Sequence, residues 1–72
     1  MEINVEIGRS IVRKRKQMGI TQEYLALEAE TSVSYLRQIE HGTANPTIKQ
    51  LERIAAPMGM ALRNPFYEPR EN

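Results

Sequence analysis

The sequence predicts an all-α domain of four to five short helices, and three observations support this fold class. Apolar residues recur three and four positions apart along most of the chain, which is the spacing that gives a helix one buried face. Residues that cap helices precede these stretches, and glycines follow several of them. The length of 72 residues suits one small core, with a thin stability margin unless the protein dimerises.

The first predicted helix runs from about Val5 to Met18. Its apolar residues have the spacing of a core face: Ile7, Ile11 and Met18, with Val12 beside them. The net charge of the chain is only +1, so the placement of the basic residues matters more than their number. This helix carries a basic window without any acidic residue: Arg9, Arg13, Lys14, Arg15 and Lys16. Such a window is either a solvated helix face or a surface for phosphate groups.

A short helix is predicted to begin after Thr21, whose hydroxyl can cap it. Glu23 in the first turn suits the positive end of the helix dipole. The inward positions have helical spacing, and two of them are small enough to let another helix approach closely. These positions are Leu25, Ala26 and Ala29.

A second short helix should run from about Val33 to His41. Ser32 can cap its start, and Gly42 supplies the left-handed residue that commonly ends a helix. Its inward positions are Leu36 and Ile39. Only residues 30–32 remain for the connection, and so short a turn forces the two helices to cross steeply. The segment is therefore a helix-turn-helix whose second helix presents one face outward.

A further helix is predicted after a short polar loop. Thr47 and Gln50 match a capping box at its start, and it should end near Pro57 or Met58. Its apolar face consists of Ile48, Leu51, Ile54 and Ala55. This helix is expected to be structural.

Residues 7–60 resemble the lambda-repressor-like family of DNA-binding domains, of the Cro/CI or Xre type. Three motifs in order carry the resemblance: Gly19-x-Thr21-Gln22-x-x-Leu25-Ala26, Ser32-x-x-x-Leu36-x-x-Ile39-Glu40-x-Gly42 and Asn45-Pro46-Thr47-x-x-x-Leu51-x-x-Ile54-Ala55. The resemblance implies a compact helix-turn-helix domain over residues 1–60 that binds double-stranded DNA. One departure is Glu30, which stands at a turn position that is usually glycine in the family. A positive φ there would cost about 1 kcal/mol relative to glycine.

Four residues are candidates for reading DNA bases, because helical geometry turns them outward when Leu36 and Ile39 face the core. Arg37 could donate two hydrogen bonds to guanine and Gln38 could pair with adenine. The other two could touch a thymine methyl group and a base edge or phosphate, and they are Val33 and Ser34.

Contacts with phosphate groups are expected from six residues: Arg13, Lys16, Gln22, Tyr35, Thr43 and Asn45. Gln22 resembles the family's glutamine that binds phosphate and supports the glutamine at the position of Gln38. Tyr35 either packs at the rim of the core or reaches the DNA backbone with its hydroxyl. Thr43 and Asn45 either donate to a phosphate, together with the helix N-terminus that follows, or serve ordinary turn chemistry.

The resemblance also implies a structural ion pair. In the family, the arginine at the position of Arg15 pairs with the glutamate at the position of Glu40. We therefore expect a partly buried Arg15–Glu40 pair that ties the first helix to the end of the helix from about Val33 to His41, the recognition helix of the family. The alternative is two independent surface charges.

The segment 61–72 is predicted to be irregular or extended, because Pro65 and Pro69 interrupt a long helix. Two alternatives stay open: residues 60–64 form a short helix that closes the core, or a strand that pairs with a second subunit. The second is slightly favoured, with the last five residues, 68–72, poorly ordered. The candidate dimerisation residues are Met60, Leu62, Phe66 and Tyr67.

Composition argues against several classes of function. The chain has no cysteine and a single histidine, His41, and it lacks aspartate, so no metal site, cofactor or catalytic triad is expected and an enzyme is improbable. The sequence contains no apolar run of membrane-spanning length and no signal-peptide pattern, which favours the cytoplasm. The favoured function is a homodimeric repressor that binds a palindromic operator. The alternative is an antitoxin-like module that binds a protein partner, a toxin, as well as operator DNA.

Overall fold

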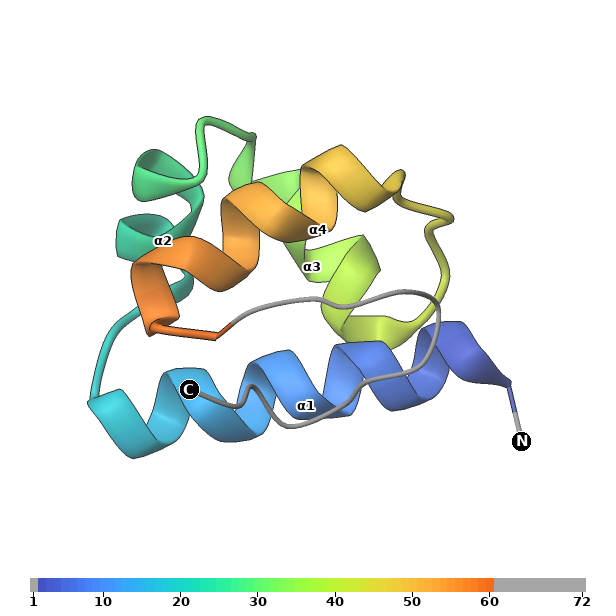
Figure 1. Ribbon diagram of the computed structural model, residues 1–72, viewed down its shortest axis with the longest axis horizontal. Helices are drawn as coiled ribbons and strands as arrows, with labels where there is room; N and C mark the ends of the chain where they lie inside the picture. The colour runs from blue at the N-terminus through green and yellow to red at the C-terminus, as the bar shows by residue number, and fades with distance from the viewer. Residues whose placement is uncertain (1, 61–72) are drawn as a thin grey trace, which may run out of the picture.

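The computed structural model describes residues 2–60 and contains, within that range, four α-helices and one short 3-10 helix (Figure 1). In chain order these are α1 (Ile3–Met18), α2 (Gln22–Glu28), α3 (Val33–His41), α4 (Ile48–Ala55) and η1 (Ala56–Met58). Helix α1 is the longest and lies along one side of the other three (Figure 1). The described part has no strand, so the predicted all-α fold is confirmed.

The predicted caps start the helices at the expected residues. The hydroxyl oxygens of Thr21, Ser32 and Thr47 each accept a hydrogen bond from the backbone N–H three residues later. Gln50 completes the predicted capping box, because its Oε1 accepts from the Thr47 N–H at 2.8 Å. Each cap satisfies backbone donors that would otherwise lack a partner at a helix start. Helix α1 begins at Ile3, slightly earlier than predicted.

The core lies between α1 and the three shorter helices. Leu25, Leu36 and Ile39 are at most 1% exposed, as their inward positions predicted. Two other core predictions are wrong, since Met18 is 44% exposed and Ile48 is 59% exposed. Met18 is the last residue of α1 and Ile48 the first of α4, and side chains at helix ends have fewer neighbours to cover them. No helix within residues 2–60 has the length and apolar character needed to cross a bilayer.

Helix α1 meets the end of α3 at Gly8, which is buried. A Cβ atom built on Gly8 would lie 2.6 Å from the carbonyl oxygen of Ile39 and 2.5 Å from that of Glu40. Only a residue without a side chain allows this backbone approach. The contact fixes α1 against the C-terminal turn of α3, and so helps to set the position of the helix that carries the candidate base-reading residues.

The turn between α2 and α3 contains a strained residue. Glu30 has φ 58°, and within residues 2–60 it is the one non-glycine residue with a positive φ. The next residue closes the turn, because the Thr31 N–H donates to the carbonyl oxygen of Ala26 at 3.0 Å. The left-handed conformation inferred from the resemblance is therefore present, and a side chain at this position is held in a region that favours glycine.

Replacing Glu30 by glycine is expected to raise the free energy of unfolding by about 1 kcal/mol, because glycine adopts positive φ without a steric penalty. Urea denaturation followed by circular dichroism measures the change. Glu30→Ala is the matched control, since it removes the carboxylate but keeps the strain. Equal stabilisation by both substitutions would show that the charge, and not the backbone conformation, is unfavourable.

Candidate nucleic-acid interface

The outward face of α3 carries three exposed polar side chains: Ser34, Arg37 and Gln38. They flank the fully buried Leu36, so the predicted division of this helix into an inner and an outer face is confirmed for these three. Val33 differs, because it is half-buried and packs against the core. Only part of its side chain is left for contact with another molecule.

The predicted ion pair between Arg15 and Glu40 is present and joins α1 to α3. Arg15 Nε lies 2.8 Å from Glu40 Oε2, and Nη2 donates to Oε1 at 3.1 Å. The two side chains are 13% and 3% exposed. The remaining terminal nitrogen, Nη1, donates to the carbonyl oxygen of Ile20 at 3.2 Å. This two-point contact with a carboxylate is the geometry in which an arginine binds most strongly and with a defined orientation.

Gln22 extends this network to the outward face of α3. Its Nε2 donates to Glu40 Oε1 at 2.8 Å, and its Oε1 accepts from Arg37 Nε at 3.3 Å. The resemblance implied that Gln22 supports Gln38. This prediction is wrong for this structure, because Gln22 contacts Arg37 instead. Arg37 and Glu40 are three residues apart and share the face of α3 beside Gln22, whereas Gln38 is rotated about 100° from Arg37 around the helix.

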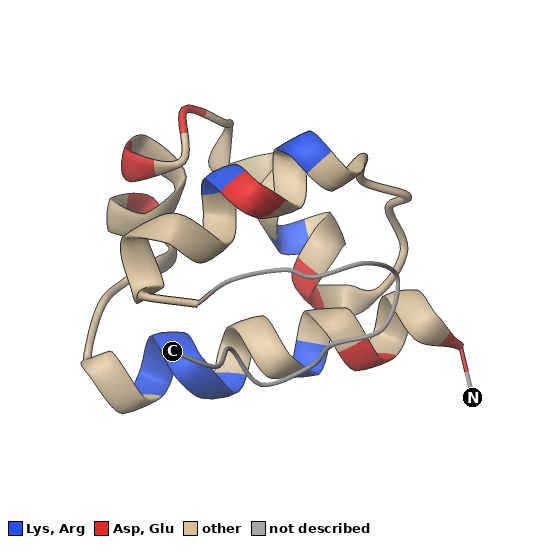
Figure 2. Cartoon of the chain, viewed as in Figure 1, with Lys and Arg blue, Asp and Glu red and all other residues tan. Residues whose placement is uncertain are grey.

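The basic residues of α1 separate into two groups. Arg15 faces the core and pairs with Glu40, and Lys14 is half-buried. The others are exposed and follow one another four and three residues apart, which places them on one side of the helix: Arg9, Arg13 and Lys16. Figure 2 shows basic residues along α1 and acidic residues on α2 and the turn after it. The positive charge is thus concentrated although the net charge is small.

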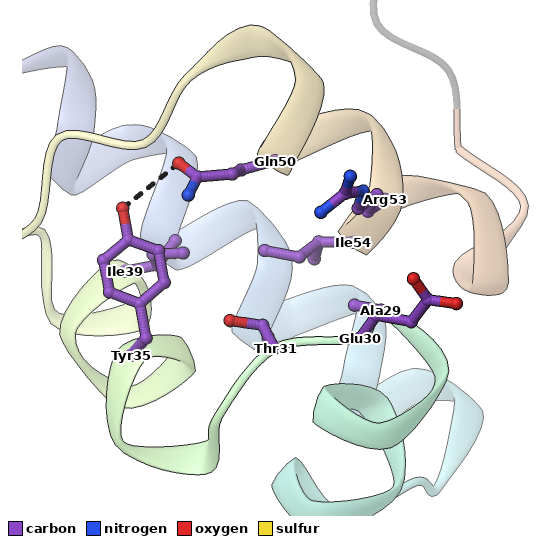
Figure 3. A pocket seen from close by; sticks show the side chains of 8 residues that line it. All are labelled: Ala29, Glu30, Thr31, Tyr35, Ile39, Gln50, Arg53 and Ile54. Carbon is purple, nitrogen blue, oxygen red and sulfur yellow. Dashed lines mark hydrogen bonds between the residues drawn. The ribbon is translucent and has the colours of Figure 1, made fainter.

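Tyr35 takes the rim-packing alternative. It is half-buried against the core, and its hydroxyl donates to Gln50 Oε1 of α4 at 3.2 Å (Figure 3). The ring borders a hollow between α4 and the α2–α3 turn. The residues that line this hollow are Ala29, Glu30, Thr31, Tyr35, Ile39, Gln50, Arg53 and Ile54. Because its proton is engaged within the domain, Tyr35 is poorly placed to donate to a phosphate.

The loop after α3 is held by two polar contacts. Thr43 Oγ1 donates to the carbonyl oxygen of Gln38 at 3.2 Å, so its hydroxyl serves the end of the helix. Asn45 Oδ1 accepts from Asn4 Nδ2 at 2.8 Å, which connects the loop to the first turn of α1. Both residues are exposed. In this structure they perform turn chemistry, and a phosphate contact by either remains a prediction.

The candidate dimerisation residues are only partly described. Met60, the last described residue, is half-buried and packs against the core. The other three candidates, Leu62, Phe66 and Tyr67, lie outside the described residues. The segment for which a helix and a strand were both predicted alternatives also lies outside them, apart from Met60.

Two features of this region were not predicted from the sequence. The hydrogen bond between Gln22 and Arg37 depends on how α2 crosses α3, and no local pattern specifies it. Gly8 did leave a signal, since a glycine inside a helical pattern costs about 1 kcal/mol and often marks a close approach of two backbones.

Comparisons with known proteins bear on this geometry. A sequence profile of the family described as helix-turn-helix matches residues 11–63. The chain is 31% identical over 61 residues to an uncharacterised HTH-type transcriptional regulator of Sinorhizobium fredii, covering 85% of this chain and 79% of that protein. It is 39% identical over 54 residues to the immunity repressor protein of Bacillus phage phi105, covering 75% of this chain and 38% of the repressor.

A solved structure agrees with the fold. The crystal structure of the restriction-modification controller protein C.AhdI from Aeromonas hydrophila matches with a TM-score of 0.80 and 23% identity, covering 85% of this chain and 92% of that one. At this identity the likeness shows the fold alone. The sequence profile and the Sinorhizobium relative show the family. The chain belongs to the Cro/CI-type (Xre) helix-turn-helix family of DNA-binding transcriptional regulators.

Proposed function

We propose that this regulator is a homodimeric repressor that inserts α3 into the major groove of a palindromic operator. The observation that carries the proposal is the outward face of α3, where Ser34, Arg37 and Gln38 are exposed on a helix whose other face is fully buried. An arginine and a glutamine offer the paired hydrogen-bonding groups that distinguish guanine and adenine in the major groove. Val33 contributes its remaining exposed surface to a thymine methyl group.

Phosphate contacts are proposed for exposed or polar residues of α1, α2, α3 and the loop after α3. Arg13 and Lys16 are exposed cations on α1, and neutralising phosphates is the largest sequence-independent contribution to DNA affinity. Thr43 and Asn45 lie in the loop after α3, beside the capped start of α4, where backbone N–H groups can receive a phosphate. Gln22 keeps one amide proton beyond its bond to Glu40, and Tyr35 is the weakest candidate because its hydroxyl proton is in use.

Dimerisation is proposed because a single recognition helix covers only a few base pairs, whereas two helices related by two-fold symmetry read both halves of a palindrome. The action as a repressor is supported by the immunity repressor among the relatives. We also place this regulator in the cytoplasm, because it must reach DNA and a bacterial chromosome lies there; the relatives from Sinorhizobium fredii and a Bacillus phage support a bacterial setting. No described residue favours the antitoxin alternative.

Selection of bound sequences from a random pool of duplex DNA tests the function directly. Wild-type protein should enrich a palindrome whose half-site spacing is close to one helical turn, about 10 base pairs. Protein that enriches no sequence at low salt would contradict the proposal.

Substitutions on the two surfaces should affect binding differently. Arg37→Ala or Gln38→Ala should weaken binding to the selected operator by about 1–3 kcal/mol and relax the preference at one base pair. Lys16→Ala should weaken binding to all sequences alike and reduce the slope of log affinity against log salt by about 0.9. Fluorescence anisotropy with matched and mutated operators measures both effects.

The matched control is Arg53→Ala, which removes the same charge from an exposed position of α4 beside the hollow of Figure 3. It should leave base preference unchanged and alter affinity little. If all of these variants lowered binding by the same factor on every sequence, the division into base-reading and phosphate-binding residues would be wrong.

A further inference from the structure

We infer that Gln22 is a positioning residue for Arg37: its side-chain amide holds the guanidinium so that the free end of Arg37 faces a guanine. The inference rests on the proposed function, in which Arg37 reads a base. It assigns to Gln22 a part in sequence preference rather than only in general affinity for DNA. The contacts that support it run from Glu40 outward.

Glu40 fixes which way the Gln22 amide is turned. The Glu40 side chain is 3% exposed, and both of its oxygens accept hydrogen bonds from Arg15, so they present acceptors to Gln22. Its Oε1 lies 2.8 Å from Gln22 Nε2. Turning the amide over would place two oxygen acceptors against each other. The nitrogen of Gln22 therefore faces inward and the oxygen faces Arg37.

The amide oxygen in turn selects one part of Arg37. It accepts from Nε at 3.3 Å, which is the donor closest to the aliphatic stem. A guanidinium has five N–H donors in a planar arrangement, and this contact uses the one on its side edge. Among the described residues 2–60 the two terminal nitrogens have no hydrogen-bond partner, so they can serve a ligand. Their end edge matches the O6 and N7 acceptors of guanine in the major groove.

This arrangement reduces the freedom of an exposed side chain before DNA binds. Arginine loses much rotamer freedom when it is ordered, and an arginine already restrained by Gln22 has less to lose. The restraint is anchored to the scaffold, because Glu40 is bound by α1 through Arg15. The chain of contacts thus runs from the buried end of α3 to the base-reading position on its surface.

A double-mutant cycle on DNA tests the inference. The variants are Gln22→Met, Arg37→Ala and the double substitution, and methionine is chosen because it keeps the length of the side chain while it removes the amide. Each is measured on the operator selected by wild-type protein and on operators with the guanine of the Arg37 position replaced. Gln22→Met should reduce the preference for guanine at that position by about 3- to 10-fold, and should have no such effect when Arg37 is already alanine.

The control is Lys16→Ala, which should weaken all of these operators equally. If Gln22→Met behaves like Lys16→Ala, lowering affinity uniformly and additively with Arg37→Ala, then Gln22 is a phosphate contact only and the inference is overturned. That result would leave the proposed function intact, because wild-type protein would still select an operator. A wild-type protein without any sequence preference would instead contradict the proposed function.

A second measurement needs no DNA. The Nε–H group of Arg37 gives its own signal in ¹⁵N–¹H spectra, and a hydrogen-bonded proton exchanges slowly with water. Wild-type protein should show a protected Arg37 signal, and Gln22→Met should exchange several-fold faster while the thermal melt confirms that the domain is folded. Equal exchange rates in the two proteins would overturn the inference, whatever the outcome on DNA.

Discussion

Glu40→Ala should lower the free energy of unfolding by about 3–5 kcal/mol, the loss typical of a buried ion pair that keeps one partner. Arg15 is only 13% exposed and directs two of its nitrogens at the Glu40 carboxylate. Without that carboxylate, a charged guanidinium remains largely removed from water and keeps one hydrogen bond, to the carbonyl oxygen of Ile20. The loss of the Gln22 contact adds to the cost.

The measurement must allow for the small size of the domain. At the usual stability of about 0.05–0.15 kcal/mol per residue, 72 residues provide only about 4–11 kcal/mol in total, so the substitution removes a large share of the stability and unfolds part of the variant if the wild type lies near the lower value. Urea titrations near 15 °C, close to the usual temperature of maximum stability, give both proteins the largest folded population from which unfolding can be measured. Glu52→Ala is the matched control, since Glu52 is an exposed glutamate of α4 and its removal should change stability by less than about 0.5 kcal/mol.

A second substitution separates the ion pair from simple loss of packing. Arg15→Met combined with Glu40→Ala leaves no charge buried without a partner, so the double variant should be more stable than Glu40→Ala alone. This recovery of stability would identify the unpaired guanidinium as the cause of the lower free energy of unfolding in Glu40→Ala. A Glu40→Ala protein within about 1 kcal/mol of wild type would mean that water reaches Arg15 and that the pair contributes little.

The capped starts of α2, α3 and α4 and the inner and outer faces of α3 could be predicted because they depend on neighbours close in sequence, whereas α1 begins two residues before the predicted Val5 and α4 ends at Ala55, before the predicted Pro57 or Met58. The hydroxyls of Thr21 and Ser32 act on a backbone N–H three residues away, and the exposure of Arg37 and Gln38 follows from the helical period. The Arg15–Glu40 pair joins residues far apart in the chain, and it was found through the family resemblance rather than through any local pattern.

Predictions that depended on how one helix packs against another were less accurate. Periodicity gave the correct face of α1 for Ile11, but it could not show that the helix extends beyond its neighbours at Met18. The partner of Gln22 is decided by which side chain of α3 lies within reach across the helix crossing, and Arg37 rather than Gln38 meets that condition. Tyr35 had two open roles for the same reason, because its bond to Gln50 belongs to the packing of α4.

Gly8→Val should destabilise the domain by about 3 kcal/mol or more, and Gly8→Ala by a smaller amount, because both place a Cβ atom against backbone. The atoms in the way are the carbonyl oxygens of Ile39 and Glu40, at 2.6 and 2.5 Å from the position of that Cβ. A flexible side chain could turn aside, but these oxygens belong to the last turn of α3. Helix α1 must therefore move away, and the Arg15–Glu40 contact loosens with it.

Gly19→Ala is the matched control for this effect. Gly19 has φ 70°, and a Cβ atom added to it would meet no atom within 4 Å, so alanine there causes strain but no collision and should cost about 1 kcal/mol. At Gly8, within α1, the intrinsic helix preference of alanine opposes the collision and favours the variant by about 1 kcal/mol. The sign of the change in the free energy of unfolding of Gly8→Ala therefore shows whether the collision outweighs the helix preference of alanine. A stabilised Gly8→Ala protein would mean that α1 and α3 lie further apart at Gly8 than the structure shows, and α1 would then hold the recognition helix through other contacts, such as the Arg15–Glu40 pair.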